Sequence, residues 1–233
     1  MQSIQKELKK YSSEERRKIN LRFFKMGKGH YGEGDTFIGV TVPDCRTVAR
    51  TFLDTSLPEL KKIMNSPIHE ERIVGLFILV ENYKKAKEER EKKRIVDFYL
   101  ENKKGVNNWD LVDLSADKIL GAYLLDKDKK ILYDLVDSTH LWDRRIGIIS
   151  TFAFIRNMQF KDTFALCEKL LSDKHDLMHK ACGWMLREIG KRDEKALDGF
   201  LKKNHSKMPR TTLRYAIERF SPTKRKSYLS GNV

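Results

Sequence analysis

Trp109 and Asp113 are the residues whose types and spacing most directly suggest chemistry. They lie in the segment NNWDLVD, and a spacing of four places them on one face of a helix. An indole can hold a flat or cationic ligand, and a carboxylate can stabilise positive charge that develops during a reaction.

Trp184 follows Lys180 by four residues. A tryptophan at such an apolar helical position is more often part of the core, and it can also form a stacking surface.

Two other patterns resemble known sites only superficially. Gly27, Gly29 and Gly32 match the spacing of a dinucleotide fingerprint, but that motif requires a preceding strand, and here a helix precedes it. We therefore interpret the segment as a plain turn. His175 and His179 have the spacing of two metal ligands, yet no third ligand lies nearby in the sequence. A structural or phosphate-contacting pair is favoured, and no metal is expected.

The composition favours a helical protein with a polyanionic partner. The 233 residues carry a net charge of +14, 34% are charged, 40% are hydrophobic, and only 5 are proline. Such a charge points to nucleic acid before an anionic membrane, although a basic protein without such a partner is the alternative. Three widely separated cysteines indicate free core thiols in a reducing compartment. Without an apolar leader or a run of about 18 apolar residues, we expect a soluble cytoplasmic protein.

Helical periodicity and stop signals predict helices along nearly the whole chain. A Gly-rich loop, GKGHYGEGDTFIGVTVP, interrupts them and ends at Pro43, which suits the first turn of the next helix. Within this loop, TFIGVTV is extended but isolated. The expected helices cover residues 3–11, 13–26, 44–54, 57–65, 68–86, 88–103, 108–124, 127–137, 140–157, 161–172, 176–191, 194–203, 208–220 and 222–229.

A degenerate internal repeat underlies these helices. The segments ERIVGLFIL, RRIGIISTF, HKACGWMLR and LRYAIERF each place a basic residue before apolar ones, namely Arg72, Arg145, Lys180 and Arg214. The intervals are 73, 35 and 34 residues, and the first is about two periods, so a further unit is expected near Trp109. Helix pairs with this period form solenoids, in which neighbouring repeats share one core.

The repeat therefore predicts an all-α fold, an α-solenoid of HEAT-like helix pairs that forms a single domain over residues 1–233. Equivalent positions on successive helices lie side by side, so the repeated cations are expected to form a basic row on a concave face. Such a row suits a phosphate backbone. Alternatively, each cation pairs with a local acid such as Glu70, Glu71 or Asp143.

The repeat alignment places Asp113 on the same face as the cations. A carboxylate among cations repels a polyanion, so its presence needs an explanation. The structural explanation is a salt bridge to Arg145, and physics alone favours it. The functional explanation is a substrate that develops positive charge beside the carboxylate.

The order and spacing of several segments resemble the AlkD-type DNA alkylation repair family, which are DNA glycosylases built from HEAT-like repeats. The segments are FIGVTVPDCR, NNWDLVD, LWDRRIGI, HKACGWMLRE and MPRTTLRYAIERF, and together they span nearly the whole chain. The Gly-rich loop here is longer than in the family.

This resemblance implies the excision of cationic N3- and N7-alkylated purines, such as 3-methyladenine and 7-methylguanine, from double-stranded DNA. It assigns the catalytic role to Asp113 and lesion contacts to Trp109, Trp184 and Phe24. Arg145 is the phosphate-contacting arginine that the motif carries over. With the other repeated cations and Arg187, the expected phosphate-binding residues are Arg72, Arg145, Lys180, Arg187 and Arg214.

The implied chemistry explains the isolated carboxylate. An alkylated purine is already cationic and leaves without protonation, so one acid can stabilise the oxocarbenium-like sugar and position water. The resemblance also implies a cradle without base flipping, which fits a sequence with no sign of a deep pocket. We expect a monomer without cofactor or obligate protein partner. The alternatives are a non-catalytic relative that binds branched or distorted DNA, and a helical-repeat scaffold for an acidic protein.

Overall fold

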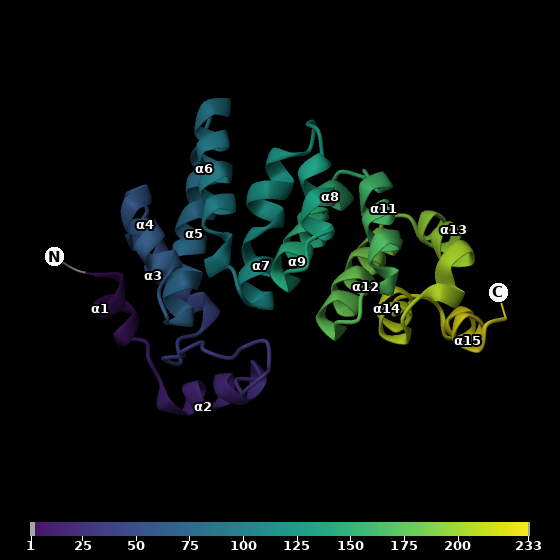
Figure 1. The fold of residues 1–233 in the computed structure, drawn as a ribbon, viewed down its shortest axis with the longest axis horizontal. Coiled ribbons are helices and arrows are strands. Elements are labelled where there is room, and N and C mark those ends of the chain that lie inside the picture. The colour runs from purple at the N-terminus through teal and green to yellow at the C-terminus, as the bar shows by residue number, and fades with distance from the viewer. Residues whose placement is uncertain (1–2, 233) are drawn as a thin grey trace. The chain divides into compact units, whose positions relative to one another are not determined.

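Residues 3–232 are described by a computed structural model of the chain, and they are almost entirely helical (Figure 1). Within these residues the β-structure is a single isolated parallel bridge between Thr36 and Ile68. The α-helices are α1 Ile4–Lys9, α2 Glu14–Phe23, α3 Val42–Thr51, α4 Leu57–Met64, α5 His69–Lys85, α6 Glu89–Glu101, α7 Trp109–Ser115, α8 Lys130–Val136, α9 Leu141–Ser150, α10 Phe152–Arg156, α11 Lys161–Lys169, α12 Asp176–Gly190, α13 Glu194–Asn204, α14 Arg210–Ala216 and α15 Pro222–Ser230.

The all-α helical-repeat fold predicted from the sequence is confirmed, but two long helices are interrupted. The helix expected over 108–124 ends as an α-helix at Ser115 and continues as a π-helical turn over Asp117–Gly121. A side chain at Gly121 would overlap the carbonyl oxygen of Ser150, so this turn lies directly against the backbone of a neighbouring helix. The helix expected over 140–157 is broken at Thr151 into α9 and α10.

The chain divides into two compact units, which meet in the sequence between Ser115 and Ala116. In the first unit α5 is the central helix and packs against α1, α3, α4, α6 and α7. Its segment from Ile73 to Val80 is buried on every side, so α5 lacks the polar face of a surface helix. The sequence predicted a single domain over 1–233, and that expectation stays a prediction.

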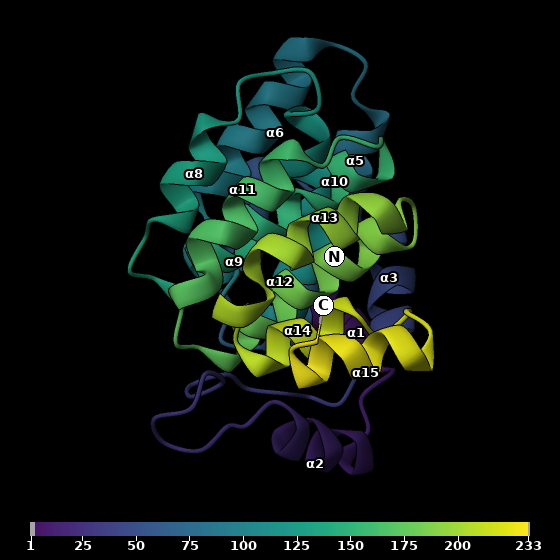
Figure 2. The same ribbon diagram turned by 90° about the vertical axis from the view of Figure 1, so that its right-hand side faces the viewer.

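In the second unit α12 is the central helix. It packs against α9, α10, α11, α13 and α14. Its buried face carries Met178, Cys182, Met185 and Ile189, which recur at the spacing expected for one side of a helix. Figure 2 shows the helices of this unit from a second direction.

Two further observations concern the cysteines and the lengths of the apolar helices. Cys45, Cys167 and Cys182 are all buried and free, so the prediction of core thiols is confirmed. In the part of the chain that the structure describes, no helix combines the length and apolar character needed to cross a membrane.

Helix α2 and the loop after it form the end of the first unit that is least covered by other elements (Figures 1 and 2). The hydroxyl of Ser13 caps α2 by accepting a hydrogen bond from the Arg16 amide. No residue of α2 is buried, and its start rests on Gly39 of the loop. Gly39 has a φ of 78° and no room for a side chain, because a Cβ would overlap the Ser13 carbonyl oxygen.

We predict that Gly39→Ala lowers the free energy of unfolding more than Gly34→Ala does. Both glycines have positive φ, so either alanine bears the left-handed strain of about 1–2 kcal/mol. Only the Cβ at position 39 would also displace Ser13 and α2, because Gly34 has open space around it. Urea unfolding of both variants measures the difference, and equal losses would contradict the docking of α2 on Gly39.

Candidate functional site

A cavity of about 720 Å³ lies in the first unit between α2, the loop, α5 and α7. Its lining is mainly apolar and aromatic, and it includes the carboxylates of Glu70, Asp110 and Asp113. Ile19 and Phe23 border it and are 48% and 60% exposed, so the cavity has an open rim. The expectation that the chain offers no deep pocket is therefore wrong. Helical periodicity does not reveal this cavity, because α2 and the irregular loop form part of its wall.

Three aromatic rings meet at this cavity. The rings of Phe24 and Trp109 are stacked, with centroids 5.4 Å apart and an interplanar angle of 17°. Phe23 contacts both rings edge-on, at 5.2 Å from Phe24 and 5.7 Å from Trp109. Trp109 is half-buried and Phe24 is buried. The structure thus brings together two aromatic residues, Phe24 and Trp109, that the sequence analysis placed in one site.

Asp113 lies one turn after Trp109 on α7 and lines the same cavity. The side chain is half-buried. A carboxylate beside an aromatic wall is suited to a ligand that carries or develops positive charge.

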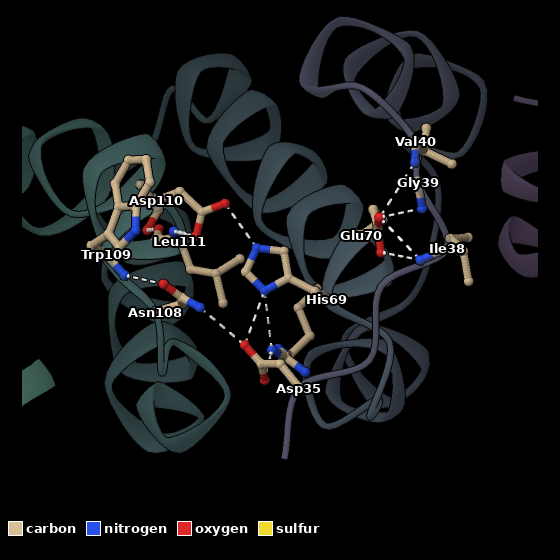
Figure 3. Close-up of polar contacts among 12 residues, drawn as sticks. Asp35, Ile38, Gly39, Val40, His69, Glu70, Asn108, Trp109, Asp110 and Leu111 are labelled. Carbon is tan, nitrogen blue, oxygen red and sulfur yellow. Dashed lines mark hydrogen bonds and ion pairs between the residues drawn. The ribbon is translucent and has the colours of Figure 1, made fainter. Parts of the chain in front are cut away.

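A cluster of buried charged groups forms part of the cavity wall, to which it contributes His69 and Asp110. Figure 3 shows the polar contacts within this cluster. The Nε2 of His69 is 2.8 Å from a carboxylate oxygen of Asp110, and its Nδ1 is 3.2 Å from a carboxylate oxygen of Asp35. Arg72 donates to the other oxygen of Asp35 at 2.5 Å. Because each ring nitrogen of His69 faces an acceptor, only the doubly protonated imidazolium can donate to both.

The charges of this cluster determine how His69 titrates. Burial lowers the pKa of His69, but Asp110 and then Asp35 outweigh burial and raise it to about 9. Burial raises the pKa of Asp35, and the hydrogen bond from His69 and the charge of Arg72 bring it below its ordinary value of 3.8.

These pKa shifts fix the pH range in which the cluster stabilises the fold. The raised pKa means that the contribution of His69 is fully present below its unfolded pKa of 6.5 and is lost as the pH rises through about 9. The depressed pKa of Asp35 gives a contribution that is present above 3.8 and is lost as the pH falls through the folded value.

The first turn of α7 is attached to this cluster on both sides of Trp109. The side-chain amide of Asn108 donates to Asp35 at 3.1 Å, and its carbonyl oxygen accepts from the Trp109 backbone amide at 2.8 Å. Asp110 bonds to His69 with one oxygen and accepts from the Leu111 amide with the other. The residues before and after Trp109 are therefore both fixed by buried hydrogen bonds.

Glu70 organises the loop on the other side of the cavity. It is buried at the start of α5, and its carboxylate accepts hydrogen bonds from the backbone amides of Ile38, Gly39 and Val40 at 2.8–3.3 Å. Figure 3 shows the carboxylate facing these successive amides. The extended segment TFIGVTV is thus held by a side chain instead of by a neighbouring strand.

Comparison with known proteins identifies the family. The family model described as DNA alkylation repair enzyme matches residues 4–220. The chain belongs to this family of DNA alkylation repair enzymes. The fold is also similar to that of a predicted DNA alkylation repair enzyme from Enterococcus faecalis, with a TM-score of 0.71, 14% sequence identity, and coverage of 91% of this chain and 97% of that chain. No curated protein matches the sequence.

Membership of the DNA alkylation repair enzyme family supports a role in the repair of alkylated DNA and suggests that the chain binds DNA. Of the residues expected at the lesion, Phe24, Trp109 and Asp113 meet at the cavity of the first unit. Trp184 belongs to α12 of the second unit, where it is half-buried and its ring lies 5.6 Å from that of Phe152.

Two of the cations expected to bind phosphate do not lie on an exposed surface. Arg72 is 4% exposed, and its guanidinium donates to Asp35 and to the Ser66 carbonyl oxygen, so its assignment as a phosphate contact is corrected. Arg145 is also 4% exposed and donates to the Leu177 carbonyl oxygen. In these two repeats the basic position holds a buried arginine that bonds to a backbone carbonyl oxygen of another segment. The sequence pattern of a basic residue before apolar ones does not distinguish such an arginine from a cation on the surface.

The remaining expected cations are more accessible. Arg214 is exposed on α14 and has no ion pair within residues 3–232. Lys180 is partly exposed and pairs with Asp176 at 2.6 Å. Arg187 forms an ion pair with Glu218 and is less exposed. Of these three cations, Arg214 is therefore the best placed to belong to an exposed basic surface of the second unit.

The sequence analysis did not find the buried cluster of Asp35, His69, Asn108 and Asp110. These residues lie in three separate segments, and polar residues at buried positions carry no periodic signal. The one local indication was that Asn108 and Asp110 directly flank Trp109.

We predict that Glu70→Gln destabilises the first unit, whereas Glu81→Gln on the same helix does not. The glutamine amide would bring N–H donors toward backbone donors that need an acceptor, at a cost of about 1–3 kcal/mol. Glu81 makes a surface pair with Lys84, which contributes about 0–1 kcal/mol. The free energy of unfolding from urea titration is the measurement. Similar values for the two variants would contradict the anchoring role of Glu70.

Proposed function

We propose that this protein is a DNA glycosylase that removes cationic N3- and N7-alkylated purines from duplex DNA. The observation that carries the proposal is that Trp109, Phe24 and Asp113 line one cavity. Phe24 stacks on Trp109, and Asp113 follows Trp109 by one turn of α7. The family supports the same broad role in alkylation repair.

The reaction needs little from the protein because the substrate is activated. The alkylated purine carries a positive charge, so the glycosidic bond breaks with its electron pair moving into the base, which leaves neutral. The remaining deoxyribose is oxocarbenium-like, and the Asp113 carboxylate stabilises its charge. A water molecule then adds to the anomeric carbon and gives up a proton, for which Asp113 is the nearby base.

Trp109 supplies the surface that favours a cationic substrate. An indole face attracts a cation by roughly 1–2 kcal/mol when both are desolvated. Phe24 stacks behind Trp109 and holds the indole in place. This contact weakens when the base loses its charge, so the same surface favours binding of the lesion over retention of the released neutral base.

We predict that Asp113→Asn reduces the release of 7-methylguanine by about 10²-fold or more, a loss typical of removing a group that stabilises charge in the transition state. The asparagine keeps the size of the side chain but removes its charge. DNA binding stays level or tightens, because a carboxylate no longer repels the phosphates. Single-turnover release of free base and binding to the same duplex are measured side by side, with Asp134→Asn, an exposed acid on α8, as the control.

A structural role for Asp113 gives a different pattern. In that case the variant loses thermal stability and DNA affinity together, and base release falls no further than binding does. Trp109→Ala is expected to lose less activity than Asp113→Asn, chiefly on methylated DNA.

We predict that Arg214→Ala weakens duplex binding and reduces the slope of log affinity against log salt concentration by about 1, as expected for the loss of one phosphate contact. The control is Lys130→Ala, which removes an exposed cation from an ion pair on α8. An unchanged slope for Arg214→Ala would remove this side of α14 from the DNA-binding surface.

The alternatives remain distinguishable by experiment. A wild-type protein that releases no base and prefers branched to linear DNA is the non-catalytic relative. A protein that binds no DNA at low salt is the scaffold for an acidic partner. The retained Trp109 and Asp113 favour the glycosylase over both.

A further inference from the structure

The buried imidazole of His69 is not needed for the chemistry proposed above, yet it contacts residues of the loop and of α7 that surround the site. Its nitrogens bond to Asp35 in the loop and Asp110 on α7. Its ring lies 4.5 Å from that of Phe37 and 5.2 Å from that of Phe24. A histidine with these contacts links the loop, α5 and the start of α7.

We infer that His69, as an imidazolium held between Asp35 and Asp110, is the positioning residue that fixes Trp109 and Asp113 at the cavity. The inference rests on the proposed function, and it identifies which residue sets the geometry of that site. His69 is itself buried, with an exposed fraction of 1%, and it acts through the residues it bonds to.

The connection to Trp109 runs along two routes. The first is the backbone, because Asp110 bonds to His69 and Asn108 bonds to Asp35, and these two residues flank Trp109 in the chain. The second runs through ring contacts, because the Phe24 ring contacts the tilted ring of His69 and stacks on the ring of Trp109. Asp113 follows on the same short helix, so a shift at the start of α7 moves both cavity residues.

The protonation of His69 controls both routes. The charged groups that reach it are Asp35, Asp110 and Arg72, so the cluster holds two carboxylates and two cations. Glu70, the next residue on α5, is directed to the loop amides at positions 38–40. Loss of the His69 proton removes one of the two hydrogen bonds that the imidazolium donates to Asp35 and Asp110, and it gives a buried cluster a net negative charge, which is costly without water.

The wild-type protein provides a test that does not depend on catalysis. The chain has three tryptophans, and the indole N–H resonance of Trp109 is the one lost in Trp109→Phe. We expect this resonance to move as the pH rises through the pKa of His69, near 9, and to follow the ring resonances of His69. In His69→Gln, which keeps hydrogen-bond donors but cannot carry the charge, this transition is absent.

Single-turnover base release is the second measurement. We expect the rate constant for 7-methylguanine release by wild-type protein, corrected for release without protein, to fall across the same pH transition. We expect His69→Gln to lower the rate constant on the order of 10²-fold at neutral pH, as a misplaced catalytic group does, with little change in DNA affinity. His205→Gln is the control, since His205 is also hydrogen-bonded but belongs to the second unit.

Two results would overturn the inference. One is a Trp109 resonance that stays constant while His69 titrates. The other is a folded His69→Gln variant with the wild-type rate and pH profile. If wild-type protein releases no base at all, the glycosylase proposal fails, while the Trp109 titration still decides whether His69 positions the cavity.

Discussion

The first unit depends on one buried interaction, the contact of the His69 ring with carboxylates on both of its sides. Asp35, His69 and Asp110 come from an irregular loop, the start of α5 and the start of α7. None of these charges could be buried alone, since an unpaired ion in the interior costs several kcal/mol. Together with Arg72 they balance, and the balance requires all three segments to be in place. The cluster therefore favours one arrangement of these segments over others that bury the same apolar residues.

The cavity follows from this arrangement. The loop that carries Asp35 continues to the backbone amides that Glu70 holds, and one of these residues, Gly39, is where the start of α2 packs. Helix α2 has no buried residues of its own, so its position depends on this loop. The aromatic wall of Phe24 and Trp109 forms between the buried cluster and helix α2. Polar groups in the interior thus position an apolar site at the surface, and Asp113 is one of the three acidic residues that line the cavity.

The features that were predicted correctly from the sequence are those that depend on helical periodicity and other local rules. Most helix positions, the proline in the first turn of α3 and the free thiols follow from local rules and are observed. The spacing of four residues, which is also a local property, placed Trp109 and Asp113 on one helix face, and the family resemblance assigned their roles. The break at Thr151 and the π turn over Asp117–Gly121 were not predicted. At Gly121 the backbone of Ser150 lies too close for a side chain, which is a tertiary contact that local helix preference does not encode.

The long-range features could not be read from the pattern. Arg72 and Arg145 share a repeated position, yet their burial depends on the carbonyl oxygens of Ser66 and Leu177. His69 begins a helix like many other polar residues, and only the folded chain brings it between two acids. In this protein the local pattern gives the fold class and part of the site, whereas tertiary contacts decide which charged residues are structural.

The central claim is that the cavity of Trp109 and Asp113 releases an alkylated base from DNA. The most direct test is incubation of the wild-type protein with a duplex that contains 7-methylguanine, followed by detection of free base and of abasic sites in the same sample. The claim predicts that free 7-methylguanine and abasic sites appear in equal amounts, with unmodified duplex left intact. Binding of the methylated duplex without release of any base would contradict it.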